Sequence, residues 1–112
     1  MQPSHNIYGE WAAGGEIDLV EAINIQPTIA STHQVHGTLH FGGVWPNNVH
    51  MGSSYTLVDS NPSQNFNTYV TDWAEDEIRW YVDGTLSGSN TSVSWYSIPN
   101  TAVVVGSNAP FD

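Results

Sequence analysis

Three carboxylates stand within six residues of the segment 14–22, and they constrain the fold more than any other feature of the chain. The acids Glu16, Asp18 and Glu21 alternate with Ile, Leu and Val in a sequence whose charged fraction is only 11%. An acidic surface loop needs no β-branched neighbours, and a fully buried strand does not accommodate three acids. The pattern therefore predicts a stiff strand with carboxylates on one face and the core against the other.

Side chains alternate along a strand, which places Glu16 and Asp18 on one face and Ile17 on the other. Glu21 has the opposite parity and would point into the core of a regular strand. One additional residue at Leu19-Val20, a β-bulge, would return Glu21 to the face of the other two acids. Because bulges are over-represented beside active sites, the spacing itself indicates a functional segment.

A helix is the alternative for this segment. Ile17, Val20 and Asn24 lie at helical spacing, and Glu, Leu and Ala are good helix formers. We favour the strand because Gly14-Gly15 precedes the segment, Pro27 follows it, and polar β-type runs make up the remainder of the chain.

The other segments predict further strands and tight turns. Residues 35–41 alternate between apolar and polar side chains, which is typical of a half-buried strand. Residues 68–73 and 77–82 predict a hairpin, and Asp83-Gly84 predicts a further tight turn. Between these elements we expect a short strand at residues 55–58 and loops at residues 24–34, 42–52, 59–65 and 87–97.

Aromatic residues make up 12% of the chain and have two different expected roles. We expect Trp73 and Trp80, on the predicted hairpin, to pack in the core. Trp11, five residues before Glu16, and Trp45, in a Gly/Pro/Asn loop, either plug the structure or form part of a binding site.

Charge excludes several classes of partner. One basic residue, Arg79, stands against 11 acidic residues, which gives a formal net charge of −10. Nucleic acids and anionic membranes both require basic surface, so neither is an expected partner. A neutral sugar polymer is also a better candidate than a polyanionic one. The histidines show no closed ligand set at a recognised spacing, so no metal site is predicted.

Four blocks of the sequence carry a family resemblance. In order, they are residues 7–14, the Glu-x-Asp-x-x-Glu run 16–21, residues 36–48, and Phe66, Tyr69 and Trp73 followed by residues 77–84. Together they resemble glycoside hydrolase family 16 in its bulged, laminarinase-like form. The acidic run alone is weakly specific, but four ordered blocks that cover nearly the whole chain are highly specific.

The resemblance implies an all-β fold, an antiparallel β-sandwich of the concanavalin-like jelly-roll type. It also implies a retaining endo-hydrolase of β-1,3-glucan of the laminarin kind. In this family Glu16 would be the nucleophile and Glu21 the general acid/base, with Asp18 between them to orient Glu16 and tune protonation. The implied substrate-binding residues are Trp11, His40 and Trp45.

Geometry and charge bear on that implied chemistry. Retaining glycosidases hold their two working carboxyls about 5–5.5 Å apart, and strand residues on one face lie at similar range. Three clustered acids should raise the pKa of at least one of them and so keep Glu21 protonated for the acid step. We expect no cofactor; a structural calcium ion is compatible with the full domain, but no ligand cluster identifies its site.

Length suggests that the domain is partial. Single-domain β folds of this kind have roughly 200–250 residues, so we expect residues 1–112 to form one truncated central part that lacks N- and C-terminal strands. The expected partner is a polysaccharide, the β-glucan substrate, and the protein is expected to be a monomer. Secretion is expected because polysaccharides are extracellular.

Two alternatives differ in function while keeping the fold. A non-catalytic β-glucan-binding module is disfavoured because both Glu16 and Glu21 are present. A hydrolase of the same family that acts on a galactan, such as agar or carrageenan, would share the bulged motif and differ in its loops. A purely structural acidic domain would explain the alternation of side chains but not three acids beside Trp11.

Overall fold

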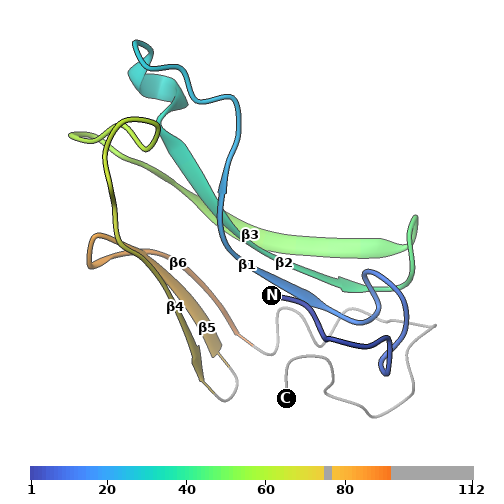
Figure 1. Cartoon of the computed structure of the whole chain (residues 1–112). Helices are drawn as coiled ribbons and strands as arrows, with labels where there is room; N and C mark the ends of the chain where they lie inside the picture. Colours follow the sequence, from blue (N-terminus) through green and yellow to red (C-terminus); the bar gives the residue numbers. More distant parts are fainter. Residues whose placement is uncertain (75–76, 92–112) are drawn as a thin grey trace.

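The computed structural model describes residues 1–74 and 77–91 as two three-stranded antiparallel sheets (Figure 1). The first sheet has the order β1-β2-β3 and the second β4-β5-β6. No helix within this described part is long and apolar enough to cross a membrane. The elements are β1 (Glu16–Ala22), a turn of 3-10 helix η1 (Ala30–Thr32), β2 (Gln34–Gly42), β3 (Asn48–Thr56), β4 (Tyr69–Ala74), β5 (Glu77–Val82) and β6 (Thr85–Thr91).

The strand prediction for the acidic segment is confirmed, because β1 covers all three carboxylates and pairs antiparallel with β2. β2 follows the predicted alternation. Val35, Leu39 and Phe41 are buried on one face, whereas its polar residues are half-buried on the other. The two strands therefore present one apolar and one polar surface.

The predicted loop at residues 42–52 is wrong over most of its length. β2 and β3 pair continuously from Gly42↔Asn48 to Gln34↔Thr56, so the connection is only the turn at residues 43–47. The small and polar residues of this strand, β3, give it no clear strand pattern in the sequence. Only the pairing with β2 shows its alternation, in which Val49 and Met51 pack against the core cluster.

The second sheet confirms the hairpin of residues 68–73 and 77–82, which appears as β4 and β5. Asp83 and Gly84 have φ values of +48° and +79°, as a tight two-residue hairpin turn requires. The predicted loop at residues 87–97 is wrong for residues 87–91, which belong to β6. Residues 92–97 lie outside the described part of the chain.

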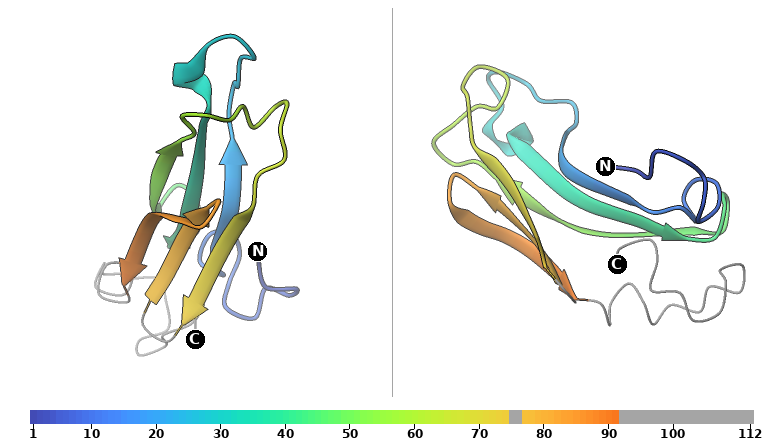
Figure 2. Two further views of the ribbon diagram at one scale, coloured as in Figure 1. Left: turned by 90° about the vertical axis from the view of Figure 1, so that its left-hand side faces the viewer. Right: turned by 60° about the horizontal axis from the view of Figure 1, so that its bottom comes forward.

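The core lies between the two sheets, which face one another in both views of Figure 2. β3 packs across β6, and β1 lies beside β4. One buried cluster joins Ile17, Leu39 and Phe41 of the first sheet to Ile78 and Trp80 of the second, and a smaller one contains Val35, Leu57 and Val82.

The expectation that both hairpin tryptophans are core residues is half right. Trp80 is 2% exposed and lies inside the main cluster. Trp73 is 47% exposed. The described residues therefore leave Trp73 more exposed than its apolar side chain predicts.

Candidate active site

A register shift between β1 and β2 produces the bulge that the sequence predicts. Two residues of β1, Leu19 and Val20, stand opposite one residue of β2, Gly37. Glu21, which follows them, therefore regains the face occupied by Asp18. The parity argument made from the sequence is confirmed.

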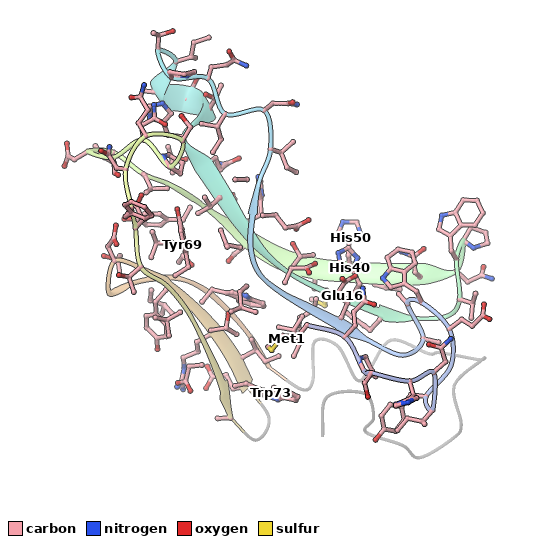
Figure 3. All side chains as sticks on the ribbon, in the orientation of Figure 1. Met1, Glu16, His40, His50, Tyr69 and Trp73 are labelled. Carbon is pink, nitrogen blue, oxygen red and sulfur yellow. The ribbon has the colours of Figure 1, made fainter. Side chains whose placement is uncertain are left out.

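Polar side chains share the face of the first sheet that points away from the second sheet, here called the open face. The residues of this face form three rows across β1, β2 and β3: Glu16–His40–His50, Asp18–Thr38–Gly52 and Glu21–His36–Ser54, in which only Gly52 lacks a polar side chain. Figure 3 shows Glu16, His40 and His50 together on this face, with Trp73 well away on the second sheet. The bulge thus gathers all three acids beside the polar side of β2.

Glu16 is held by two donors from the segment that precedes β1. The indole Nε1 of Trp11 donates to Oε2 at 2.7 Å, and Nε2 of Gln2 donates to Oε1 at 2.5 Å. Burial acts to raise the pKa of Glu16. The hydrogen bonds from Gln2 and Trp11, together with the charge of His40, outweigh burial and lower the pKa below its ordinary value. Glu16 is thus kept as a carboxylate.

Asp18 has the opposite electrostatic environment. Burial raises its pKa above the ordinary value, and the negative charges of Glu16 and Glu21 raise it further against the opposing charge of His40. Nε2 of His40 lies 3.2 Å from Oδ2 of Asp18. The expected rise in pKa from clustering three acids therefore falls on the central acid.

Glu21 leans back along the strand towards Asp18. The backbone of Glu21 pairs with His36, four residues along β2 from the partner of Glu16, which is roughly 13 Å of strand at ~3.3 Å per residue. The two glutamates are therefore not neighbours on this face of the strand, because the row of Asp18 lies between them. However, Oγ1 of Thr38 donates to Oε2 of Glu21 at 2.7 Å. That contact brings the carboxyl to the row of Asp18, about 7 Å of strand from the row of Glu16.

The two tryptophans expected to bind substrate lie at different places relative to the carboxylates. Trp11 is 41% exposed, and its ring centroid lies 5.7 Å from that of His40. Trp45 is 70% exposed in the β2–β3 turn, where its backbone N–H lies 3.5 Å from the carbonyl oxygen of Trp11. Trp11 thus adjoins the carboxylates directly, whereas Trp45 stands at the edge of the open face.

Three of these residues could hold a cation by geometry alone. Ligand atoms of Glu16, Asp18 and His40 all lie within 4.8 Å of one another. The same groups already have protein partners: Glu16 accepts from Trp11 and Gln2, and Asp18 contacts His40. A metal ion would have to displace these contacts.

Two residues near the acids were not singled out from the sequence. Gln2 lies in the N-terminal segment, and no local pattern connects it with Glu16. His50 pairs with His40, and their ring centroids lie 6.0 Å apart. Alternation around Val49 and Met51 was the signal that could have identified His50, had residues 48–52 been assigned to a strand.

Comparison with known proteins gives one family. The profile of glycosyl hydrolases family 16 matches residues 3–107. Glucan endo-1,3-beta-glucosidase A1 from Niallia circulans is 42% identical over 113 aligned residues, which cover 100% of this chain and 15% of that protein. The chain therefore spans a small part of this relative's length.

Solved structures show the same fold. A family 16 endo-glucanase from Bacteroides ovatus, in complex with G4G3G-2F-DNP, aligns with a TM-score of 0.63 at 24% identity, over 79% of this chain and 37% of that chain. The laminarinase catalytic domain from Thermotoga maritima MSB8 aligns with a TM-score of 0.57 at 29% identity, over 75% of this chain and 32% of that chain. Since the family profile covers most of the sequence and the antiparallel β architecture agrees, this chain belongs to glycoside hydrolase family 16.

Proposed function

We propose that the protein is a retaining endo-hydrolase of β-1,3-glucan. The observation that carries this proposal is the bulge in β1, because it leaves Glu16 and Glu21 on one face of one strand with Asp18 between them. A pair of carboxyl groups flanking a glycosidic bond is the usual requirement for glycoside hydrolysis.

In the first step Glu16 is the nucleophile. A carboxylate oxygen of Glu16 forms a bond to the anomeric carbon while the bond from that carbon to the leaving oxygen breaks. Glu21 donates its proton to the leaving oxygen, so the departing sugar leaves as a neutral alcohol. The lowered pKa of Glu16 supports this assignment, since only the ionised carboxylate attacks.

In the second step Glu21 acts as a base. It takes a proton from water, the water oxygen bonds to the anomeric carbon, and the bond to Glu16 breaks. Both displacements invert the carbon, so the product retains the configuration of the substrate. The lean of Glu21 towards Thr38 supports this pairing, because it shortens the separation along the strand towards the about 5–5.5 Å of retaining enzymes.

Asp18 and His40 support the pair from its centre. Contact with His40 fixes the carboxyl of Asp18, and the charges of Glu16 and Glu21 that help to raise its pKa couple it to both glutamates. Asp18 would thereby orient Glu16 and tune the protonation of the pair.

A neutral β-1,3-glucan is the substrate that best fits the open face. The relative from Niallia circulans is named as a glucan endo-1,3-beta-glucosidase. A net charge of −10 would repel a sulfated polymer, whereas the exposed rings of Trp11 and Trp45 offer apolar surfaces on which sugar rings stack. Because such polymers lie outside cells, we infer that the enzyme is secreted. We further propose that it acts as a monomer without a cofactor.

A reducing-sugar assay on laminarin, lichenan and agarose tests the proposal, using the full-length protein with Glu16→Gln as the control. We expect release from laminarin that the variant abolishes, and proton NMR should show the β-anomer as the first product. Release from agarose alone would identify a galactan hydrolase. Binding of laminarin without release from any polymer would identify a glucan-binding module.

A further inference from the structure

We propose that Trp80 is a positioning residue for the general acid/base, because its indole N–H holds the β1 bulge that aims Glu21. This inference rests on the roles proposed for Glu16 and Glu21. It concerns a residue of the opposite sheet that lies in the core and touches neither glutamate.

The contact between the two sheets falls at the bulge itself. Nε1 of Trp80 donates to the backbone carbonyl oxygen of Asp18 at 2.9 Å, across 62 positions of sequence. Asp18 is the last residue of β1 in register before the shift. A bulge locally disrupts the ladder of backbone hydrogen bonds, so a donor from outside the sheet stabilises the carbonyl at its start.

Gly37 makes room for this contact. It is the one residue of β2 opposite the bulge, and a Cβ placed on it would lie 2.4 Å from Cδ1 and 2.5 Å from Nε1 of Trp80. Any side chain at this position would push the indole away from Asp18. The glycine, the bulge and the tryptophan thus form one unit, here called the bulge clamp (Gly37, Leu19-Val20 and Trp80).

The clamp acts on one glutamate more than on the other. Glu16 precedes the bulge and is held by Trp11 and Gln2. Glu21 follows the bulge, so its direction depends on the shape of the bulge. A regular ladder without the shift would pair Glu21 with Val35, which is a buried core residue.

Burial of an ionised carboxylate already disfavours that regular register. The indole bond therefore adds a finer effect, which is to fix the bulge in the one shape that directs Glu21 towards Thr38. When the bond is lost we expect Glu21 to stay on the open face and donate its proton less efficiently.

This effect has a signature that a general loss of stability lacks. Proton donation matters most for a leaving group of high pKa and little for an activated one such as dinitrophenolate. A misdirected Glu21 should therefore slow poor leaving groups selectively. A merely less stable enzyme would lose activity on all substrates by the same factor.

The experiment replaces Trp80 in the full-length protein with 3-benzothienylalanine, which keeps the bicyclic shape and exchanges the N–H for sulfur. The matched control is the same replacement at Trp73. kcat/KM is measured on aryl β-laminaribiosides with leaving groups of graded pKa. We expect a loss of about 10- to 100-fold for the poorest leaving group, the scale of a small misplacement of a catalytic group, no more than a small loss for dinitrophenol, and no change in the control.

Gly37→Ala gives an independent route to the same state, since its Cβ displaces the indole, and it should reproduce the leaving-group dependence. Glu21→Ala supplies the reference slope. Equal losses on all substrates for both clamp variants, beside a steep slope for Glu21→Ala, would overturn the role of Trp80 alone. A flat slope for Glu21→Ala would instead overturn the proposed function.

Discussion

Each sheet contains a bulge, and only one of the two builds a site. In β1, Leu19 and Val20 stand opposite Gly37, and the residue that follows is Glu21. In β6, Ser87 is the extra residue opposite the step from Trp80 to Tyr81. Its hydroxyl donates to the carbonyl oxygen of Trp80 at 3.0 Å.

The difference lies in what each bulge redirects. The β1 bulge moves an acid from the core face to the open face, where it joins two other acids. The β6 bulge lies next to the hairpin turn and satisfies a backbone carbonyl with a small hydroxyl. A bulge is thus a general device of strand geometry, and its function comes from the side chains that follow it.

The charges around the two bulges differ in the same way. On the second sheet Arg79 contacts Glu77 and lies 3.5 Å from Asp72, so these two acids have a cationic partner at the surface. On the first sheet three acids lie together, with His40 beside Asp18. The three acids of the open face therefore have no arginine or lysine beside them, since Arg79 lies on the second sheet.

The largest expected effect comes from lengthening the β1 bulge. An alanine inserted after Val20 moves Glu21 one residue further along β1; a regular ladder would then place Glu21 opposite Gln34 instead of His36 and carry its carboxyl away from Thr38. We expect activity on laminarin to fall about 10²- to 10⁴-fold, the range of general acid catalysis. An alanine inserted after Ser87 in β6 should leave most of the activity, as measured with the same assay.

Shortening the same bulge should have a smaller effect. Deletion of Val20 would leave Leu19 alone opposite Gly37 and keep Glu21 opposite His36, on the open face. We expect this variant to retain far more activity than the insertion. If deletion and insertion were equally inactive, the position of Glu21 opposite His36 would not be the property that the bulge provides.

The acids of the two sheets should respond differently to neutralisation. Asp18→Asn removes a group whose pKa is raised above 3.8, chiefly by burial. A carboxyl with a raised pKa supports folding at pH values below its unfolded pKa and loses that contribution as the pH rises through the folded pKa. The variant should therefore unfold at a higher temperature than the wild type at pH 7, and the difference should vanish towards pH 3.

Asp18→Asn should also lower kcat on laminarin by about 100-fold, the scale of a misplaced catalytic group. Asp72→Asn on the second sheet should change neither property, since exposed ion pairs contribute little. A stable and fully active Asp18→Asn enzyme would contradict the orienting role of Asp18.

A change in pH dependence is expected at Trp11. Trp11→Phe removes the N–H that lowers the pKa of Glu16, so that pKa should rise. The acid limb of the kcat/KM profile should then move to higher pH, because the nucleophile must be ionised. Trp73→Phe on the second sheet should leave the limb in place. An unmoved limb in Trp11→Phe would show that another group sets it.

A smaller effect is expected at His50, which shares the row of Glu16. If His50 contacts one sugar unit, His50→Ala should raise KM for laminarin by roughly two- to tenfold, the worth of one net hydrogen bond, with kcat unchanged. Thr85→Ala, an exposed position of the second sheet, is the matched control. A fall in kcat without a change in KM would place His50 in the chemistry instead.

The smallest effect is expected from metal removal. Glu16, Asp18 and His40 already have protein partners, so EDTA should leave activity and melting temperature unchanged. Loss of activity restored by one divalent cation would show that the full domain requires a metal, held by these three side chains or at a structural calcium site.

Much of the fold follows from local patterns. β1, β2 and the β4–β5 hairpin have regular alternation, and Asp83-Gly84 is a strong turn signal, so each could be predicted. The start of β3 and residues 87–91 of β6 could not, because their small and polar residues have weak strand preference. Their conformation is determined by pairing with β2 and β5.

The site was less completely predictable. Parity located the bulge and the shared face of the acids, because both depend on neighbouring residues. The sequence could not tell which acid has the raised pKa, since this depends on the burial of Asp18 and on Gln2 and Trp11 folding back onto Glu16. The bond from Trp80 to Asp18 is equally invisible, because it joins two sheets.

The most direct test of the central claim is to trap the covalent intermediate. The full-length enzyme is incubated with a 2-deoxy-2-fluoro laminari-oligosaccharide that carries a dinitrophenyl leaving group, and its peptides are analysed by mass spectrometry. If the bulge pairs Glu16 and Glu21 as proposed, the label should be found on Glu16 and be absent from Glu16→Gln. A label on Glu21, or an unlabelled enzyme whose first product is the inverted anomer, would contradict the account.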